Sequence, residues 1–247
     1  MPQKIITKKI NNLILKIFIL TLSISLLSAC SSQVKQANIK NAAEFNAQLG
    51  ARYLQAGRLK LANEKLSKAL EQNPNSSEAN HYFAILQQRI GDNKAATKYF
   101  KKAISIDHDN PRLLNNYGTF LCQLGKYDKA VEQFNLAVKS PYYQTPEFAY
   151  TNAGICLLKN NDSVQAESYF RKALEKNTNF GSALFQMAKL NYHQGNFAKA
   201  QAFLLRYNEK NPDSEETLSL CSAINTRLGD IDKANACSEK RLRLLSK

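Results

Sequence analysis

Five cysteines and three histidines are the residues of this chain whose chemistry could be catalytic or metal-binding. His81, His108 and His193 lie far apart, and none stands beside a Ser or Cys in a nucleophile motif. The sequence has no C-x-x-C or H-x-x-x-H spacing of the kind that holds a metal ion. It also lacks the G-x-S-x-G, H-E-x-x-H and Gly-rich phosphate-loop motifs. We therefore expect a protein that is not an enzyme and that takes no metal, no cofactor and no small-molecule substrate.

Cys30 follows a leader with three zones. A basic stretch over residues 4–16 precedes an apolar stretch over residues 17–27, and Leu27-Ser28-Ala29-Cys30 ends the leader. The apolar stretch is too short to cross about 30 Å of hydrocarbon. The arrangement resembles a bacterial lipoprotein signal, in which the Cys thiol takes the lipid. We expect residues 1–29 to be a signal peptide and Cys30 to be lipidated; the alternative is a plain signal peptide with a chance cysteine.

This signal predicts where the protein works. We expect residues 30–42 to form the lipidated N-terminus and a polar tether, in the periplasm. Ser31 after the lipidated Cys resembles an outer-membrane address. No second apolar run of about 18 residues follows, so we expect a lipid anchor alone.

The net charge of +14 is less informative than it looks. Four leader lysines contribute to it, and the remaining chain has 30 basic against 20 acidic residues. A basic balance can indicate nucleic-acid binding, but a periplasmic lipoprotein rarely meets nucleic acid. We expect no nucleic-acid partner. An apolar fraction of 44% with 22% charged residues is typical of a folded protein.

An internal repeat accounts for the rest of the chain. Small turn residues recur at intervals of 34, 34, 36, 34 and 34 residues, and an Ala follows each one five positions later. The turn residues are Gly57, Gly91, Gly125, Asn161, Gly195 and Gly229. A glycine can take the left-handed conformation that ends a helix, and Asn tolerates the same torsion. Gly118 and Gly154 put a small residue where two helices must approach closely.

The period of 34 residues resembles the tetratricopeptide repeat, a helix-turn-helix unit that stacks into a right-handed superhelix. We expect an all-α solenoid of six repeats over residues 43–247. Their ranges are 43–76, 77–110, 111–146, 147–180, 181–214 and 215–247. Ser238 and Arg241 replace apolar or Ala positions in the last repeat, which favours a solvent-facing cap.

The other four cysteines are even in number and lie in a compartment that we expect to be oxidising, which favours two disulfides. Cys122 and Cys156 occupy nearly equivalent positions in adjacent repeats. Cys221 and Cys237 face each other across the two helices of the last repeat. We predict these two pairings, with free buried thiols as the alternative.

The concave surface of such a superhelix is lined by the first helix of each repeat, and it is wide enough for an extended peptide or a helix. The candidate partner-binding residues on that surface are Arg89, Arg112, Asn115, Thr119, Phe148, Thr151, Ile155, Lys159, Phe185, Lys189 and Tyr192. Asn115, Asn116 and Asn152 could bond a partner's backbone, although Asn is also common at these positions for structural reasons. Exposed aromatic residues beside basic ones are typical interface anchors.

A two-residue insertion separates the third and fourth repeats. It lies in a Pro-punctuated segment over residues 140–148 that contains Tyr142 and Tyr143. One interpretation is a binding loop that presents both tyrosines. The other is that they cover a kink between two packed halves.

Two blocks of sequence carry a more specific resemblance. They are Asn115-Asn116-Tyr117-Gly118-Thr119-Phe120-Leu121-Cys122 and Tyr150-Thr151-Asn152-Ala153-Gly154-Ile155-Cys156. Together with the lipobox, the Pro-Tyr-Tyr insertion and six repeats, they resemble the PilF/PilW family of type IV pilus biogenesis lipoproteins. Thr119 departs from that pattern, where the family has a large aromatic residue.

This resemblance implies a pilotin, which escorts type IV pilus secretin subunits to the outer membrane and promotes their multimerisation. It places Tyr150 among the candidate partner-binding residues. We expect a monomeric scaffold. Two alternatives stay open: a lipid-anchored scaffold for peptidoglycan enzymes or proteases, and an accessory factor of β-barrel assembly.

Overall fold

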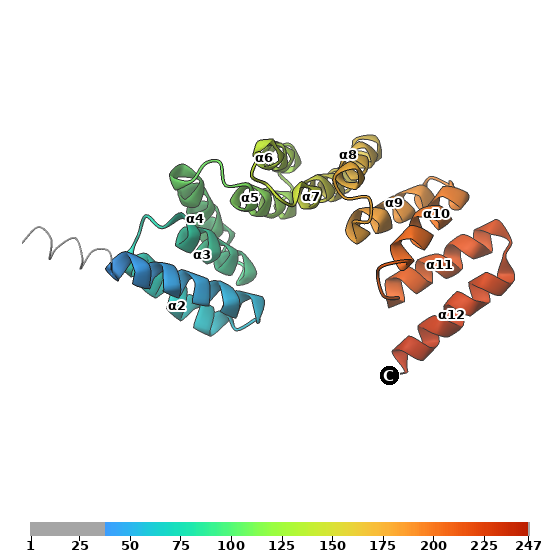
Figure 1. The fold of residues 1–247 in the computed structure, drawn as a ribbon, viewed down its shortest axis with the longest axis horizontal. Coiled ribbons are helices and arrows are strands. Elements are labelled where there is room, and N and C mark those ends of the chain that lie inside the picture. Colours follow the sequence, from blue (N-terminus) through green and yellow to red (C-terminus); the bar gives the residue numbers. More distant parts are fainter. Residues whose placement is uncertain (1–37, 247) are drawn as a thin grey trace, which may run out of the picture. The chain divides into compact units, whose positions relative to one another are not determined.

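The described part of the chain is helical throughout. A computed structural model describes residues 38–246, and no strand occurs among them. Cys30 and the predicted signal peptide lie outside this range. The all-α fold of paired helices predicted from the repeat is confirmed (Figure 1).

The chain divides into two compact units, one ending at Ile106 and one beginning at Asp107. The first unit contains a helix over residues 38–55, then α2 (Leu59–Gln72), α3 (Ser77–Arg89) and α4 (Asn93–Ile106). The second unit contains α5 (Pro111–Gln123), α6 (Tyr127–Lys139), α7 (Pro146–Lys159), α8 (Ser163–Lys176), α9 (Gly181–His193), α10 (Phe197–Asn208), α11 (Glu215–Leu228) and α12 (Ile231–Leu245). Within the second unit each helix packs on the next one along the chain.

A repeated buried stripe holds the second helix in each of the first four repeats. On α6 the stripe consists of Ala130, Phe134 and Ala137, which are at most 1% exposed. These positions are separated by four and three residues, so they lie on one face of the helix. Burying a Phe side chain in this way stabilises the fold by about 2–3 kcal/mol.

Gly118 on α5 gives that Phe room. A Cβ atom added at this position would lie 2.8 Å from the Phe134 ring and 3.1 Å from the backbone oxygen of Ala130. The close approach of α5 to α6 therefore requires glycine, as the sequence predicts.

The turns between paired helices also have the predicted backbone. All five turn glycines of the repeat have φ between 69° and 86°, and Asn161 has φ of 58° in the fourth turn along the chain. These residues end the first helix of each pair in the left-handed conformation.

The two ends of the repeat array compare differently with the prediction. Residues 38–42 are helical, although the sequence assigned them to the tether. The helical spacing of Ile39, Ala43 and Ala47 extends the first helix toward the N-terminus, because Ala43 and Ala47 are fully buried. In the last repeat, Ala234 is the only buried residue of α12, as a solvent-facing cap predicts, and the half-buried Ser238 hydroxyl lies 2.9 Å from that of Ser222 on α11.

Candidate functional site

The first helices of the last four repeats form one continuous surface in the second unit. Helices α5, α7, α9 and α11 pack on one another in that order. Figure 1 shows α5, α7 and α9 on the inner side of the bend of this unit, with α6 and α8 on its outer side. We call the surface of these four helices the inner surface.

A disulfide joins the first two of these helices. Cys122 on α5 bonds to Cys156 on α7, with 5.7 Å between their Cα atoms. Cys221 on α11 bonds to Cys237 on α12, with 6.0 Å between their Cα atoms. The first bond links neighbouring repeats and the second closes one repeat. Both hold the backbone of the inner surface in place.

Two of the predicted asparagines bond each other. The Asn152 side-chain amide donates to the Asn115 side-chain oxygen at 3.0 Å, which adds a polar bridge between α7 and α5. The Thr119 hydroxyl donates to the Asn115 backbone oxygen at 3.0 Å. Asn116 is half-buried beside them. A side-chain amide has two donor hydrogens and two acceptor lone pairs, so each bridging Asn can form further bonds.

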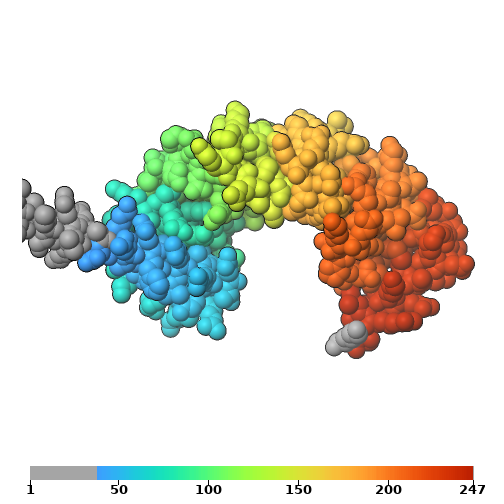
Figure 2. All heavy atoms as spheres, in the orientation of Figure 1, coloured from blue at the N-terminus to red at the C-terminus, as the bar shows by residue number. Residues whose placement is uncertain are grey.

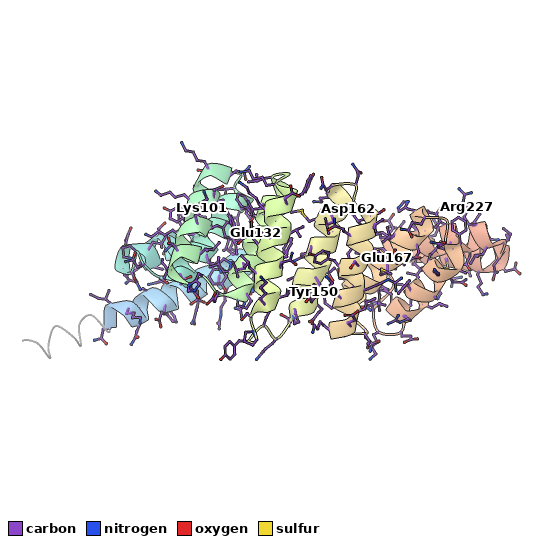
Figure 3. The ribbon with its side chains drawn as sticks, turned by 90° about the horizontal axis from the view of Figure 1, so that it is seen from above. Lys101, Glu132, Tyr150, Asp162, Glu167 and Arg227 are labelled. Carbon is purple, nitrogen blue, oxygen red and sulfur yellow. A yellow bond between two sulfur atoms is a disulfide. The ribbon has the colours of Figure 1, made fainter. Side chains whose placement is uncertain are left out.

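The predicted residues of α7 have different positions. Phe148 is 47% exposed, and its ring meets the Phe180 ring edge-on at 4.7 Å between centroids. Ile155 is half-buried and Lys159 is exposed, so both are accessible to a partner. Tyr150, labelled in Figure 3, is half-buried and its ring lies 6.3 Å from that of Tyr169 on α8.

The prediction that Thr151 binds a partner is wrong. Its side chain is only 2% exposed, because it packs into the interior at a position where α5 and α9 carry Asn115 and Phe185. A buried threonine cannot contact a protein that binds the surface.

The two inserted tyrosines differ in environment. Tyr142 is 88% exposed and offers its whole ring to solvent. Tyr143 is half-buried, and burial raises the pKa of its phenol, an effect that Glu147 increases and that Thr145 and Arg112 oppose. The charge of the exposed Arg112 therefore acts near this loop. Tyr142 fits the binding-loop interpretation, and Tyr143 fits the packing interpretation.

The inner surface is hollowed between α9 and α11. A pocket of about 450 Å³ is lined there by Phe185, Lys189, Tyr192, His193, Glu215, Glu216, Ser219, Leu220 and Ala223. Figure 2 shows this end of the chain in orange and red. The Lys189 ammonium lies 3.1 Å from a Glu216 carboxylate oxygen and 4.7 Å from the centre of the Phe185 ring. The pocket thus combines aromatic surface with charges of both signs.

The α11 side of this pocket is absent from the candidate residues named from the sequence. Glu216, Ser219 and Ala223 occupy the second, fifth and ninth positions of the last repeat, the same positions that identify the lining residues of earlier repeats. The positional rule could have found them.

Arg89, the candidate in the first unit, has a structural contact. Its guanidinium donates to the backbone oxygen of Leu54, near the end of the helix over residues 38–55. Its side chain is otherwise exposed.

Two classes of feature are absent from residues 38–246. No group of three or more His, Cys, Asp or Glu side chains in this range could hold a metal ion. No helix in the same range is long and apolar enough to cross a lipid bilayer.

Comparison with known proteins agrees with this architecture. The tetratricopeptide repeat family matches residues 80–110, 99–132 and 157–224. The type IV pilus assembly protein PilF of Pseudomonas aeruginosa is 34% identical over 156 residues, which cover 63% of this chain and 62% of PilF. An uncharacterised protein of Haemophilus influenzae is 32% identical over 60% of this chain and 82% of its own length.

Solved structures give the same relationship over more of the chain. The structure of P. aeruginosa PilF superposes with a TM-score of 0.76 at 29% identity, over 84% of this chain and 93% of that one. PilW, a type IV pilus biogenesis factor, superposes with a TM-score of 0.73 at 26% identity, over 80% and 91% of the two chains.

The chain belongs to a PilF/PilW-like family of tetratricopeptide repeat proteins. The inner surface and the two disulfides described above are thus features of a PilF/PilW-like protein. Proteins with this repeat mediate contacts between proteins, which agrees with a surface formed by four successive first helices.

Proposed function

We propose that this protein acts in type IV pilus biogenesis by binding subunits of the pilus secretin and promoting their assembly into the outer-membrane pore. The likeness to PilF carries this proposal, because it extends over 84% of the chain and includes nearly the whole PilF structure. PilF is a type IV pilus assembly protein, and PilW is a pilus biogenesis factor.

The inner surface is the proposed secretin-binding site. Its α5 and α7 are joined by the Cys122–Cys156 bond and by the hydrogen bond between Asn115 and Asn152. A preformed surface loses little conformational entropy on binding. The pocket between α9 and α11 would take an apolar side chain of the partner against Phe185 and Tyr192. Arg112, Lys159 and Phe148 would contact the same segment nearer to α5 and α7.

The lipid at Cys30 is the proposed anchor, and the inner face of the outer membrane is the proposed location. A protein confined to a membrane surface meets a partner there at a high effective concentration, so each contact can be weak. Binding would also cover the unpaired β-strand edges of secretin subunits before the pore closes.

A deletion strain tests this function. Membranes are fractionated, and the secretin is resolved into SDS-resistant multimer and monomer. We expect the deletion to remove the multimer and to leave monomer at the inner membrane. Normal multimer in the outer membrane of the deletion strain would overturn the proposal.

A strain with Cys30→Ala tests the anchor separately. If the lipid carries the secretin to the outer membrane, this strain should mislocalise the secretin although the protein itself is present. If the secretin reaches the outer membrane normally in this strain while the deletion strain fails, the anchor part of the proposal is wrong and the binding part stands.

A further inference from the structure

Helix α4 in the first unit carries four lysines and no acidic residue. Lys94, Lys98, Lys101 and Lys102 recur at spacings of three and four residues, which places them on one side of the helix. The first three side chains are exposed and Lys102 is half-buried. Figure 3 labels Lys101 on this helix. At a rise of 1.5 Å per residue, the stripe is about 12 Å long.

The opposite side of α4 fixes this orientation. Ala96, Phe100 and Ala103 are fully buried, and the neighbouring Tyr99 ring meets Phe83 of α3 edge-on at 4.6 Å. The helix therefore cannot turn its lysines inward without losing its core contacts.

Ion pairing among the described residues does not account for the stripe. None of the ion pairs found within residues 38–246 involves any of these four lysines. Of the two acidic residues that flank the helix, Asp92 accepts a hydrogen bond from the Ala95 backbone at the helix start, and Asp107 accepts one from the Asn110 side-chain amide. Other second helices differ: Arg171 pairs with Glu167 on α8, and Arg243 with Glu239 on α12.

The repeat itself does not require lysine at these positions. On α6, 34 residues later, Asp128 and Glu132 stand where α4 has Lys94 and Lys98. The two compact units also differ in charge. Residues 38–106 contain 11 basic and 5 acidic residues, whereas residues 107–246 contain 17 and 15. Positive charge is thus concentrated in the first unit, and most strongly on α4.

We propose that this lysine stripe docks on an anionic phospholipid surface. The stripe lies on the solvent-exposed face of α4. Such a face suits a broad, flat partner with distributed negative charge. Lysine suits such a partner because its ammonium is a compact, hydrated charge without the paired geometry that Arg offers to a single phosphate or carboxylate. Near an anionic bilayer each Lys is attracted to the surface, so four neighbouring lysines act together.

Docking through α4 is distinct from the proposed lipid anchor and from the secretin site. It would hold the first unit against the bilayer in a defined orientation, which a lipid anchor on a tether cannot do. Docking on phospholipid does not require a role in pilus biogenesis. It can be measured on vesicles that contain no secretin.

Vesicle sedimentation tests this docking. The chain from residue 31 to 247, which contains every described helix, is mixed with vesicles of phosphatidylcholine alone or with about 30% phosphatidylglycerol, at about 0.05 M and 0.5 M salt. The variant carries Lys→Gln at 94, 98, 101 and 102. The control carries Lys→Gln at 129, 172, 176 and 199, which are exposed in the second unit and remove the same charge. Circular dichroism checks that each protein keeps its helices.

We expect the wild type to bind the anionic vesicles at low salt and to bind neither the neutral vesicles nor any vesicle at high salt. The α4 variant should bind at least about tenfold more weakly, and the control should change by less than about twofold. Equal losses in both variants would overturn the proposal, because net charge would then explain the binding. Wild-type binding to poly-glutamate without binding to anionic vesicles would also overturn it and would favour an acidic peptide as the partner.

Discussion

At the scale of single residues, the turns of this protein show how backbone conformation selects a side chain. Five of the six turns between paired helices have glycine with positive φ, and the sixth has Asn161 with φ of 58°. A Cβ atom in this left-handed region costs about 1 kcal/mol, less for Asn than for most other residues. Asn161 therefore carries a small strain that the other turns avoid.

This strain gives a first prediction. Asn161→Gly should raise the free energy of unfolding by up to about 1 kcal/mol, and Asn161→Ala should lower it by about 1 kcal/mol. Urea unfolding at neutral pH measures both. Because the two variants remove the same amide, opposite signs would isolate the backbone effect. Equal destabilisation by both would show instead that the Asn side chain itself is needed.

Tyr143 gives a prediction about pH. Burial raises the pKa of its phenol, so the folded protein holds this proton more tightly than the unfolded chain does. Its contribution to stability is complete below the ordinary tyrosine pKa of about 10 and is lost as the pH rises through the folded-state value. Tyr143→Phe should make the free energy of unfolding fall less between about pH 9 and 11. Part of the fall should stay, because burial also raises the pKa of Tyr117. Identical curves for variant and wild type would contradict the prediction.

At the scale of helices, one disulfide joins two neighbouring repeats and the other joins the two helices of a single repeat. The bond between Cys122 and Cys156 closes 34 residues and joins the first helices of neighbouring repeats. The bond between Cys221 and Cys237 closes 16 residues inside one repeat. Repeat proteins gain stability from interfaces between neighbours, so the first bond supports an interface and the second supports one unit of the array.

We therefore predict a larger loss from the first pair. By the loop-entropy relation, Cys122→Ala with Cys156→Ala should cost about 4 kcal/mol, and Cys221→Ala with Cys237→Ala about 3 kcal/mol. Urea unfolding of both double variants under oxidising conditions measures the difference. Mass spectrometry of unreduced peptides from the wild type checks the pairing. A peptide linking Cys122 to Cys221 or Cys237 would contradict the structure.

At the scale of the whole molecule, the two units differ in charge and in the role that we propose for each. The first unit carries the lysine stripe of α4, and the second carries the inner surface with its pocket between α9 and α11. In that pocket Glu216 faces Lys189 at 3.1 Å, and its side chain is 66% exposed. A change there alters the binding surface without opening the core.

We predict that Glu216→Arg weakens the proposed binding of the secretin about five- to tenfold, because it removes the partner of Lys189 and adds a like charge beside it. Glu175→Arg is the matched control. Glu175 is exposed on α8, so this substitution makes the same charge change outside the pocket. Binding of each purified variant to immobilised secretin measures the effect. Unchanged binding by Glu216→Arg would place the secretin site elsewhere.

Much of the fold can be predicted from the sequence because the same residue pattern occurs in six successive repeats. The period of 34 residues predicted the helix pairs, the left-handed turns and the close approach at Gly118. The same frame placed Cys122 near Cys156. The first helix was predicted too short, since residues before Ala43 carry a weaker apolar pattern.

The sequence by itself determined the helical architecture, because each helix needs only its own apolar spacing and a small residue at each turn. The tertiary structure decided which side chains are accessible. Thr151 is buried although it shares a repeat position with the half-buried Asn115 and Phe185, and Tyr142 is exposed while Tyr143 is not. Accessibility depends on which side chains of neighbouring helices fill the space around a residue. The side chains around a residue come from distant parts of the chain, so its accessibility is fixed only when the repeats pack together.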